Sequence, residues 1–521
     1  MSPTRREALA QLAALAALPM SERAWRRVAS DPLDGTIAEY QAGRRRGAWS
    51  AAEVTALALE RCRSEGVRLR AIDMLSPTAL DEARAADARL RSGRTRGPLD
   101  GVPVFAKAIY DMAGLPTTGS NAEWARIFPE PVRRDALEVA RLRASGAIVL
   151  GKTAADDFAY HGNGTSSLTG QVLNPRDPSG TRTPGGSSAG SAVAVATGMA
   201  FAALGTDDGG SNRIPAQFTG VVGMKPTFGL VARTGVIPTW PYLDTHGPLA
   251  RHVADAALLL AAVAGADASD PLAIATSNGA SLATLRGGAL AGVRLGIVEA
   301  HVPRAQMTAE AVATWDRAVA ELRAAGATVE PFTPAVTRVD YRDTFAAAAR
   351  ARGDVGVDPK SPAPTANALL RYFEGRTSDA RAAMRRGYAA YRAFYDALPA
   401  TYEECQPLLD RPMRDDPAGR SFARSRAAVI EALAHSMGAA RVTAMVYPTM
   451  PFNAPRAVDD WPDVRTALGY GNWLGLPEVS VPAGVGADGM PALSVSFVGL
   501  PRADARVLAL AGDYERRRSP T

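Results

Sequence analysis

Short apolar segments that predict β-strands alternate along this chain with segments that predict helices. Residues 102–106, 147–150 and 200–205 are apolar runs of strand length. Residues 78–90 and 135–144 show helical patterns instead. Alternation of this kind favours a central sheet covered by helices. We therefore predict an α/β fold, an α/β/α sandwich around a mixed, mostly parallel sheet.

The same alternation continues to the end of the chain. The further elements are two short helices within 37–62, the second beginning at the capping box of Ser50 and Glu53, a helix at 188–197, strands at 221–225, 293–298, 442–447, 479–482 and 493–498, a helix through Val312 to Leu322, and a closing helix at 503–514. Strands from both halves must meet in one sheet, so residues 31–515 are predicted to form one large domain.

One internal region departs from this alternation. Residues 341–441 are rich in Ala and Arg, have a helical pattern and carry no recognisable chemical motif. We expect this helical variable region to cover the site and to shape substrate access.

The first 30 residues are assigned to a separate N-terminal segment. Arg5 and Arg6 precede the apolar run 8–18, which resembles a twin-arginine export signal. The run is short and has no clear cleavage site, so an amphipathic first helix of a cytosolic enzyme fits as well. A periplasmic or exported location and a cytoplasmic one both stay open. No other segment has the ~20 apolar residues that a membrane span needs.

Charge and ligand-forming residues exclude several classes of function. The net charge of +6 comes from Arg scattered among Asp and Glu, without a nucleic-acid recognition motif. Cys62 and Cys405 are too few for a disulfide framework, and the five histidines lack the short spacings of a zinc site. We expect no nucleic-acid partner, no metal and no other cofactor.

Lysine is rare in this chain. Lys107, Lys152, Lys225 and Lys360 are the only four, while Arg supplies nearly all other positive charge. A buried ammonium can lose its proton, whereas a guanidinium effectively cannot. Lys107, directly after the strand predicted at 102–106, is therefore a functional candidate. Each of the other three lysines is as easily retained by chance as for a function.

Two segments concentrate Gly, Ser and Asp, at 185–190 and 205–213. Glycines let backbone N–H groups approach a ligand, as an oxyanion hole or a phosphate cradle requires. A serine in such a loop is a candidate nucleophile. Either loop alone is more often a plain turn beside a helix, but two loops with an upstream lysine favour a catalytic site.

Residues 186–190 also fit Gly-x-Ser-x-Gly, the nucleophile elbow of α/β-hydrolases, with Ser188 as the nucleophile. That interpretation needs a downstream acid followed by a histidine, and His301 and His435 lack a recognisable setting. It also leaves residues 205–213 unexplained, so we disfavour it.

The longer motifs resemble those of the amidase signature family. They are Gly-Gly-Ser-Ser-Ala-Gly-Ser at 185–191, Leu-Gly-Thr-Asp-Asp-Gly-Gly-Ser-Asn-Arg-Ile-Pro at 204–215 and Gly-Val-Val-Gly-Met-Lys-Pro-Thr at 220–227. Weaker similarity covers most of the chain outside 341–441. The resemblance implies a serine hydrolase that acts on linear amides and a small-molecule amide as its substrate.

Carried over by position, the resemblance implies that Ser211 is the nucleophile, Ser187 the bridging acid and base, and Lys107 the general base. A neutral, desolvated lysine can activate serine near neutral pH. Ser187 would follow a cis peptide bond from Gly186.

The resemblance also implies the surroundings of the nucleophile. The backbone N–H groups of Asp208, Gly209, Gly210 and Ser211 would form the oxyanion hole. Asp207 and Arg213 would form a buried pair that braces the loop, with a plain surface ion pair as the alternative. Lys152 and Lys225 are expected to brace turns rather than to take part in chemistry.

The sequence departs from the family pattern near the site. Ala108-Ile109 stand where Asp-Asn usually follows the lysine, and Asp208 stands where Thr or an apolar residue is usual. A carboxylate at Asp208 lies beside a site that must stabilise negative charge, so an inward side chain would disfavour anionic substrates or slow turnover. Asn212 and Thr219 also depart from the pattern.

Three functions remain after these observations. The leading one is an amidase that releases ammonia or an amine from a carboxamide. The second is the related amidotransferase subunit, which makes ammonia from glutamine for a partner that amidates charged tRNA. The third is an inactive scaffold that keeps the fold. The identity of the amide and the oligomeric state cannot be predicted, because variable loops set the pocket.

Overall fold

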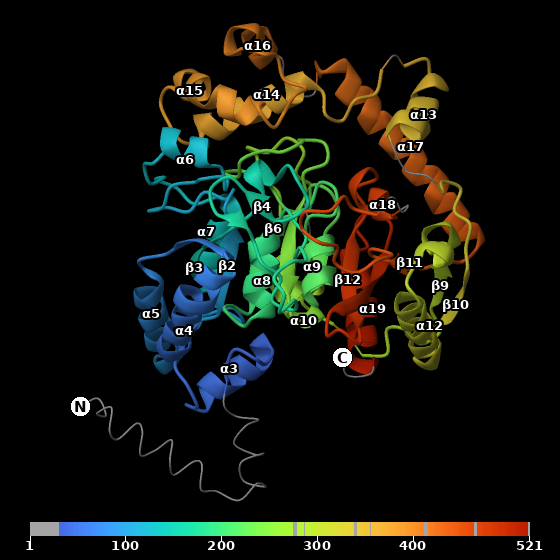
Figure 1. Cartoon of the computed structure of the whole chain (residues 1–521), viewed down its shortest axis with the longest axis horizontal. Helices are drawn as coiled ribbons and strands as arrows, with labels where there is room; N and C mark the ends of the chain where they lie inside the picture. Colours follow the sequence, from blue (N-terminus) through green and yellow to red (C-terminus); the bar gives the residue numbers. More distant parts are fainter. Residues whose placement is uncertain are drawn as a thin grey trace, which may run out of the picture.

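The computed structural model describes residues 31–518 apart from 275–278, 286, 338–340, 355, 411–414 and 463–465. The predicted N-terminal signal at 1–30 lies outside the described residues. An 11-stranded sheet runs through the molecule in the order β1-β3-β2-β6-β8-β7-β12-β13-β11-β9-β10, with helices packed around it (Figure 1). The predicted α/β fold with one mixed sheet is confirmed.

The strands have the following bounds: β1 Ile72–Leu75, β2 Pro103–Lys107, β3 Ile148–Thr153, β6 Ala202–Thr206, β7 Val222–Lys225, β8 His246–Ala250, β9 Arg294–Ile297, β10 Thr328–Pro331, β11 Ala444–Pro448, β12 Glu478–Val485 and β13 Pro491–Val498, with β4 Thr165–Ser166 and β5 Gly170–Gln171 in a separate pair.

The α-helices have the following bounds: α3 Ile37–Arg45, α4 Ala51–Arg61, α5 Ala79–Arg91, α6 Ala122–Ile127, α7 Leu137–Ala144, α8 Ala189–Ala196, α9 Arg213–Thr219, α10 Val253–Val263, α11 Gly279–Leu282, α12 Ala309–Ala324, α13 Ala346–Arg350, α14 Pro362–Glu374, α15 Ala380–Arg392, α16 Tyr402–Leu409, α17 Pro417–Ala439, α18 Leu468–Asn472 and α19 Asp504–Arg517. Short 3-10 or π turns occupy Cys62–Gly66, Asp157–Ala159, Glu299–His301, Arg304–Gln306 and Tyr341–Phe345.

Each predicted strand overlaps an observed one, and the predicted capping box is present. Ser50 Oγ accepts from the Glu53 backbone N–H, and the Glu53 carboxylate accepts from the Ser50 backbone N–H. Three strands of the large sheet, β1, β8 and β10, were not predicted. None of the three is a continuous apolar run; β8, for example, contains His246, Gly247 and Pro248.

The expectation of a mostly parallel sheet is wrong. The groups β3-β2-β6 and β11-β9-β10 are parallel, but six of the ten strand pairings in the sheet are antiparallel. The reason is the middle of the sheet, where β8 lies antiparallel between β6 and β7, and β12 and β13 form an antiparallel pair beside them.

The described residues of 341–441 form mainly α13 to α17, as their helical pattern predicts, and α14, α15 and α16 lie over one end of the sandwich (Figure 1). Aromatic side chains join this helical cover to α6: the Trp124 ring lies 5.7 Å from Phe373 and 6.4 Å from Tyr391. Tyr391 also donates a hydrogen bond to the Pro238 carbonyl at 2.7 Å. The cover is therefore packed onto the sandwich. Among the described residues, no helix combines the length and apolar character needed to cross a membrane.

Gly190 in α8 provides a test of this packing. An added Cβ would lie 2.5 Å from the Ala154 carbonyl oxygen, whereas a Cβ at Gly438 in α17 would meet nothing within 4 Å. We expect Gly190→Ala to lower the free energy of unfolding by about 1–3 kcal/mol, since the backbone must move. Gly438→Ala should raise it by about 0.5–1 kcal/mol. Urea unfolding followed by circular dichroism measures both, and equal shifts in one direction would contradict the packing described.

Candidate active site

Lys107 ends β2, and Thr206 ends the parallel neighbour β6. Parallel strands present their carboxyl ends at one edge of a sheet, so the two side chains meet there. Lys107 Nζ donates to Thr206 Oγ1 at 2.9 Å and to Ser187 Oγ at 2.7 Å. Lys107 is fully buried. Two of the three residues predicted to be catalytic are therefore in direct contact.

The surroundings of Lys107 favour a neutral amine. Its hydrogen-bond partners are hydroxyl groups, and desolvation disfavours the charged form of a buried lysine. Burial lowers the pKa of Lys107 to about 8, while the carboxylates of Asp208, Asp156 and Asp244 oppose that shift.

Ser187 directly precedes Ser188 and α8, and the Gly186–Ser187 peptide bond is cis, as the resemblance implied. Gly186 has no room for a side chain, because an added Cβ would lie 2.6 Å from Asp156 Oδ1. The Asp156 backbone N–H also donates to the Ser187 carbonyl at 3.2 Å. The segment after β3 therefore fixes the backbone at Ser187.

Ser211 lies in the turn between β6 and α9 and is 7% exposed. Its carbonyl accepts a hydrogen bond from the Ser188 N–H at 3.2 Å, which ties the two serine loops together. Ser188 itself is buried, and its hydroxyl donates to the Thr206 carbonyl at 3.2 Å. That position gives no support to Ser188 as an exposed nucleophile.

The four backbone N–H groups predicted for the oxyanion hole differ in their bonding. The Gly210 N–H donates to Asp207 Oδ1 at 2.7 Å. In the described part of the chain, the N–H groups of Asp208, Gly209 and Ser211 have no acceptor. An added Cβ at Gly209 would meet nothing within 4 Å, so this residue faces open space. Three of the four groups are therefore without a hydrogen-bond partner among the described residues, and Gly210 is committed to the Asp207 carboxylate.

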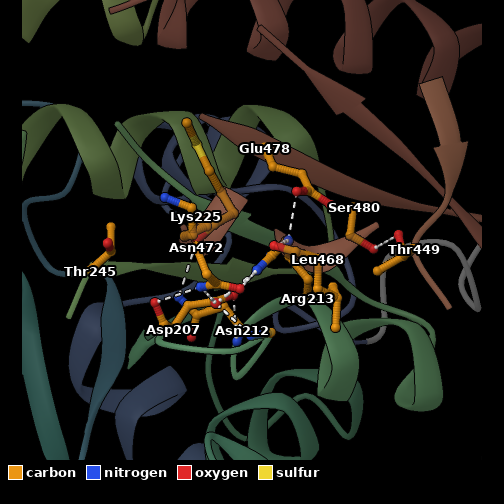
Figure 2. Close-up of polar contacts among 12 residues, drawn as sticks. Asp207, Asn212, Arg213, Lys225, Thr245, Thr449, Leu468, Asn472, Glu478 and Ser480 are labelled. Carbon is orange, nitrogen blue, oxygen red and sulfur yellow. Dashed lines mark hydrogen bonds and ion pairs between the residues drawn. The ribbon is translucent and has the colours of Figure 1, made fainter. Parts of the chain in front are cut away.

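A buried charge network braces this loop, as Figure 2 shows. Arg213 donates to both carboxylate oxygens of Asp207, each at 2.9 Å, and to Glu478 Oε2 at 2.6 Å. Asn472 accepts from Arg213 at 2.6 Å and donates to Asp207 at 2.8 Å. Against the effect of burial, Arg213 holds the pKa of Asp207 well below its usual range. The structure therefore forms the buried Asp207–Arg213 pair that the resemblance implied, and adds Glu478 and Asn472 to it.

The remaining lysines lie outside the serine loops. Lys152 donates to the Pro116 carbonyl at 2.6 Å and to Thr117 Oγ1 at 2.9 Å, and Lys225 donates to the Pro226 carbonyl at 2.8 Å. Both are fully buried. These contacts agree with bracing roles. Lys360 lies 3.5 Å from the centre of the Trp240 ring.

Sequence reasoning missed a second group of buried charges beside the site. His246 on β8 contacts Glu138 through Nδ1 and lies 3.4 Å from Asp244 Oδ1 through Nε2. Burial acts to lower its pKa, but Glu138 and Asp244 raise the pKa of His246 to about 9. The only available signal was the histidine itself, because β8 was not recognised as a strand.

A cavity of about 510 Å³ lies beneath the helical cover. Asp111, Arg233, Asp244, Tyr372 and Arg376 are among the residues that line it. Arg376 is 3.2 Å from Asp111 Oδ1, so a helical-cover residue reaches the segment that follows Lys107. In the described part of the chain, no group of three or more His, Cys, Asp and Glu side chains is arranged to hold a metal ion.

Arg213 supplies the test of the network. Arg213→Leu leaves Asp207 and Glu478 buried without their shared cation, and we expect a loss of about 3–5 kcal/mol of folding free energy. Arg304→Leu is the matched control, since Arg304 pairs with Asp316 at 46% side-chain exposure and exposed pairs contribute roughly 0–1 kcal/mol. Chemical unfolding measures both variants. Equally small losses of folding free energy in both variants would show that the buried network stabilises the fold no more than an exposed ion pair does.

Comparison with known proteins identifies the family of this chain. A family model described as Amidase matches residues 53–508. The A subunit of glutamyl-tRNA(Gln) amidotransferase from Symbiobacterium thermophilum is 36% identical over 90% of this chain and 94% of its own length. The mitochondrial counterpart from Ixodes scapularis is 33% identical over 85% and 88%. The crystal structure of peptide amidase from Stenotrophomonas maltophilia superposes with a TM-score of 0.75 at 30% identity, covering 93% of this chain and 98% of that one. The chain therefore belongs to the amidase signature family, and it is an enzyme of the amidase type.

Proposed function

We propose that this enzyme hydrolyses a carboxamide bond through an acyl-enzyme on Ser211. The observation that carries the proposal is the contact between Lys107 Nζ and Ser187 Oγ at 2.7 Å, which is buried and free of a carboxylate partner. A base in this position acts on a serine that lies beside the Ser211 loop. The proposal is further supported by similarity to the peptide amidase, whose name describes hydrolysis of an amide.

Acylation begins with neutral Lys107, which takes the Ser187 hydroxyl proton while Ser187 takes the proton of Ser211. Ser211 Oγ then attacks the amide carbonyl carbon. Free backbone N–H groups in the Asp208–Ser211 turn stabilise the oxyanion. Ser187 returns a proton to the leaving nitrogen, and Lys107 restores it to Ser187, so the amine departs neutral.

Deacylation uses the same residues. Ser187 takes a proton from the attacking water while Lys107 supports it as the base. The second tetrahedral intermediate collapses, the proton returns to Ser211, and the carboxylic acid leaves. Esters are side substrates for the same machinery.

A second candidate function is favoured by the similarity to the A subunit of glutamyl-tRNA(Gln) amidotransferase, at 36% identity across 90% of the chain. In that role the same site would release ammonia from glutamine for a partner protein. Co-purification with a partner, and glutaminase activity that depends on it, would favour this candidate. Removal of the N-terminal segment during export would exclude it.

Active-site labelling tests the proposed nucleophile. A small fluorophosphonate should add one phosphonyl group per chain, located at Ser211 by peptide mapping, because only an activated serine reacts. Lys107→Ala should abolish labelling, while Lys360→Ala, a lysine on the Trp240 ring, should label as the wild type does. Intact-mass spectrometry is the measurement. Modification of Ser188 would revive the elbow interpretation, and an unreactive wild-type chain would favour the inactive scaffold.

The pH dependence tests the base. Because burial lowers the pKa of Lys107 to about 8, kcat/KM for a neutral amide should rise with pH and level off above about 8, where the amine is deprotonated. Lys107→Arg should lose more than about 1,000-fold in kcat at every pH, since a guanidinium stays charged. Initial rates from pH 5 to 10 give the profile. A profile that falls through this range would be incompatible with a neutral lysine base.

A further inference from the structure

Asp208 lies directly in the turn that carries Ser211, and its carboxylate is unusually placed. The residue is 5% exposed, and neither Oδ1 nor Oδ2 receives a hydrogen bond in the described part of the chain. Buried carboxylates normally accept several hydrogen bonds or pair with a cation. Asp207, one residue earlier, shows the usual arrangement, with Arg213 and Asn472 as partners.

The cations near Asp208 are largely committed to other acids. His246 lies between Glu138 and Asp244. Arg233 pairs with Asp270, with Nε 2.8 Å from Oδ2. Among the positive charges, Lys107 acts most strongly on Asp208; burial and then Asp244 raise the pKa of the Asp208 carboxyl well above its usual range.

Without a further cation, burial favours the neutral form of Asp208, and an ionised Asp208 would work against the proposed catalysis. The proposed mechanism needs Lys107 neutral, yet Asp208 is the carboxylate that most strongly favours the charged form of Lys107. A cation supplied by the substrate would balance Asp208 in place of Lys107 and would leave the amine free to act as the base.

We propose that Asp208 binds a positively charged group of the substrate, so that the preferred substrates are amides carrying an ammonium or guanidinium group close to the scissile bond. This inference rests on the proposed amide hydrolysis and specifies its substrate class. Such groups present several N–H donors, which match an acceptor-only carboxylate with both oxygens unoccupied.

The carboxylate belongs to the same turn as the proposed nucleophile. Asp208 precedes Gly209, which faces open space, and lies three residues before Ser211. Asp244, the acid that acts most strongly on Asp208, also lines the cavity beneath the helical cover.

Substrate pairs test this selectivity. We would compare ω-ammonio alkanamides with their methyl-terminated isosteres, and N-(2-aminoethyl) amides with N-propyl amides, which place the cation on the acyl or the leaving side. In the wild type, kcat/KM should favour the cation in one series by about 10- to 100-fold, the usual range for a charge-assisted hydrogen bond. Asp208→Asn and Asp208→Thr should collapse that ratio.

Asp255→Asn is the matched control. Asp255 is also a buried acid, and it accepts from the Ile37 N–H at 3.0 Å. It follows the end of β8 that pairs with Ala202, whereas Thr206 and His246 pair at the other end. The cation preference should survive in this variant. Equal kcat/KM within both wild-type pairs, or a preference that persists in Asp208→Asn, would overturn the proposal.

A binding measurement separates this inference from the proposed reaction. In calorimetry, n-butylammonium and guanidinium chloride should bind the wild type more tightly than 1-butanol does, and Asp208→Asn should weaken the cations at least about tenfold. Failure of fluorophosphonate labelling with intact cation binding would refute the reaction and keep the cation site. Labelling of Ser211 without any cation preference in binding would refute the site, with Asp208 then a neutral, protonated acid.

Discussion

The loop that carries Ser211 depends on one buried cation, the guanidinium of Arg213. It joins Asp207, at the start of the loop, to Glu478 on β12, which is 265 positions after Arg213 in the chain. A guanidinium does not lose its proton in a protein. Burial of its charge is therefore strongly destabilising unless carboxylate partners balance it. Asp207 in turn accepts from the N–H groups of Gly210 and Asn212. The conformation around Ser211 is therefore complete only when the C-terminal strands have joined the sheet.

Lys107 is as buried as Arg213 but has no carboxylate partner. Its hydrogen-bond partners are the hydroxyls of Ser187 and Thr206 rather than carboxylates. Desolvation outweighs the opposing carboxylates of Asp208, Asp156 and Asp244, none of which pairs with Lys107, and the amine can become neutral. Arg213, which cannot lose its proton, is thus paired with carboxylates, whereas Lys107, which can, has hydroxyl partners.

Sequence patterns predicted those parts of the fold that are specified locally. The strand predicted at 102–106 and the turns around Ser187 and Ser211 follow from an apolar run and glycine-rich motifs, whereas Lys107 was singled out by the rarity of lysine and the roles of all three residues by the family resemblance. β8 was missed because His246, Gly247 and Pro248 carry no strand pattern; its pairing with both β6 and β7 determines its conformation. Strand direction was wrong for the same reason, since it depends on which distant strands become neighbours. Glu478 was placed beside a predicted strand, but nothing local indicates its partner Arg213.

The proposed catalytic residues and the charges around them come from different parts of the fold. Lys107, Ser187 and Ser211 lie on segments whose geometry is set by β2, β6 and the two glycine-rich turns. The charges around them come from elsewhere: Asp244 and His246 from β8 and the loop before it, and Arg376 and Tyr372 from the helical cover through Asp111. Changes in those outer elements can alter the charge and shape that meet a substrate without moving the base or the serines. Asp208 is the exception, because it places a charge inside the catalytic turn itself. In the proposed reaction, a charge at that position would act on the substrate and on Lys107 together, so substrate choice and activation of the base would be linked through one side chain.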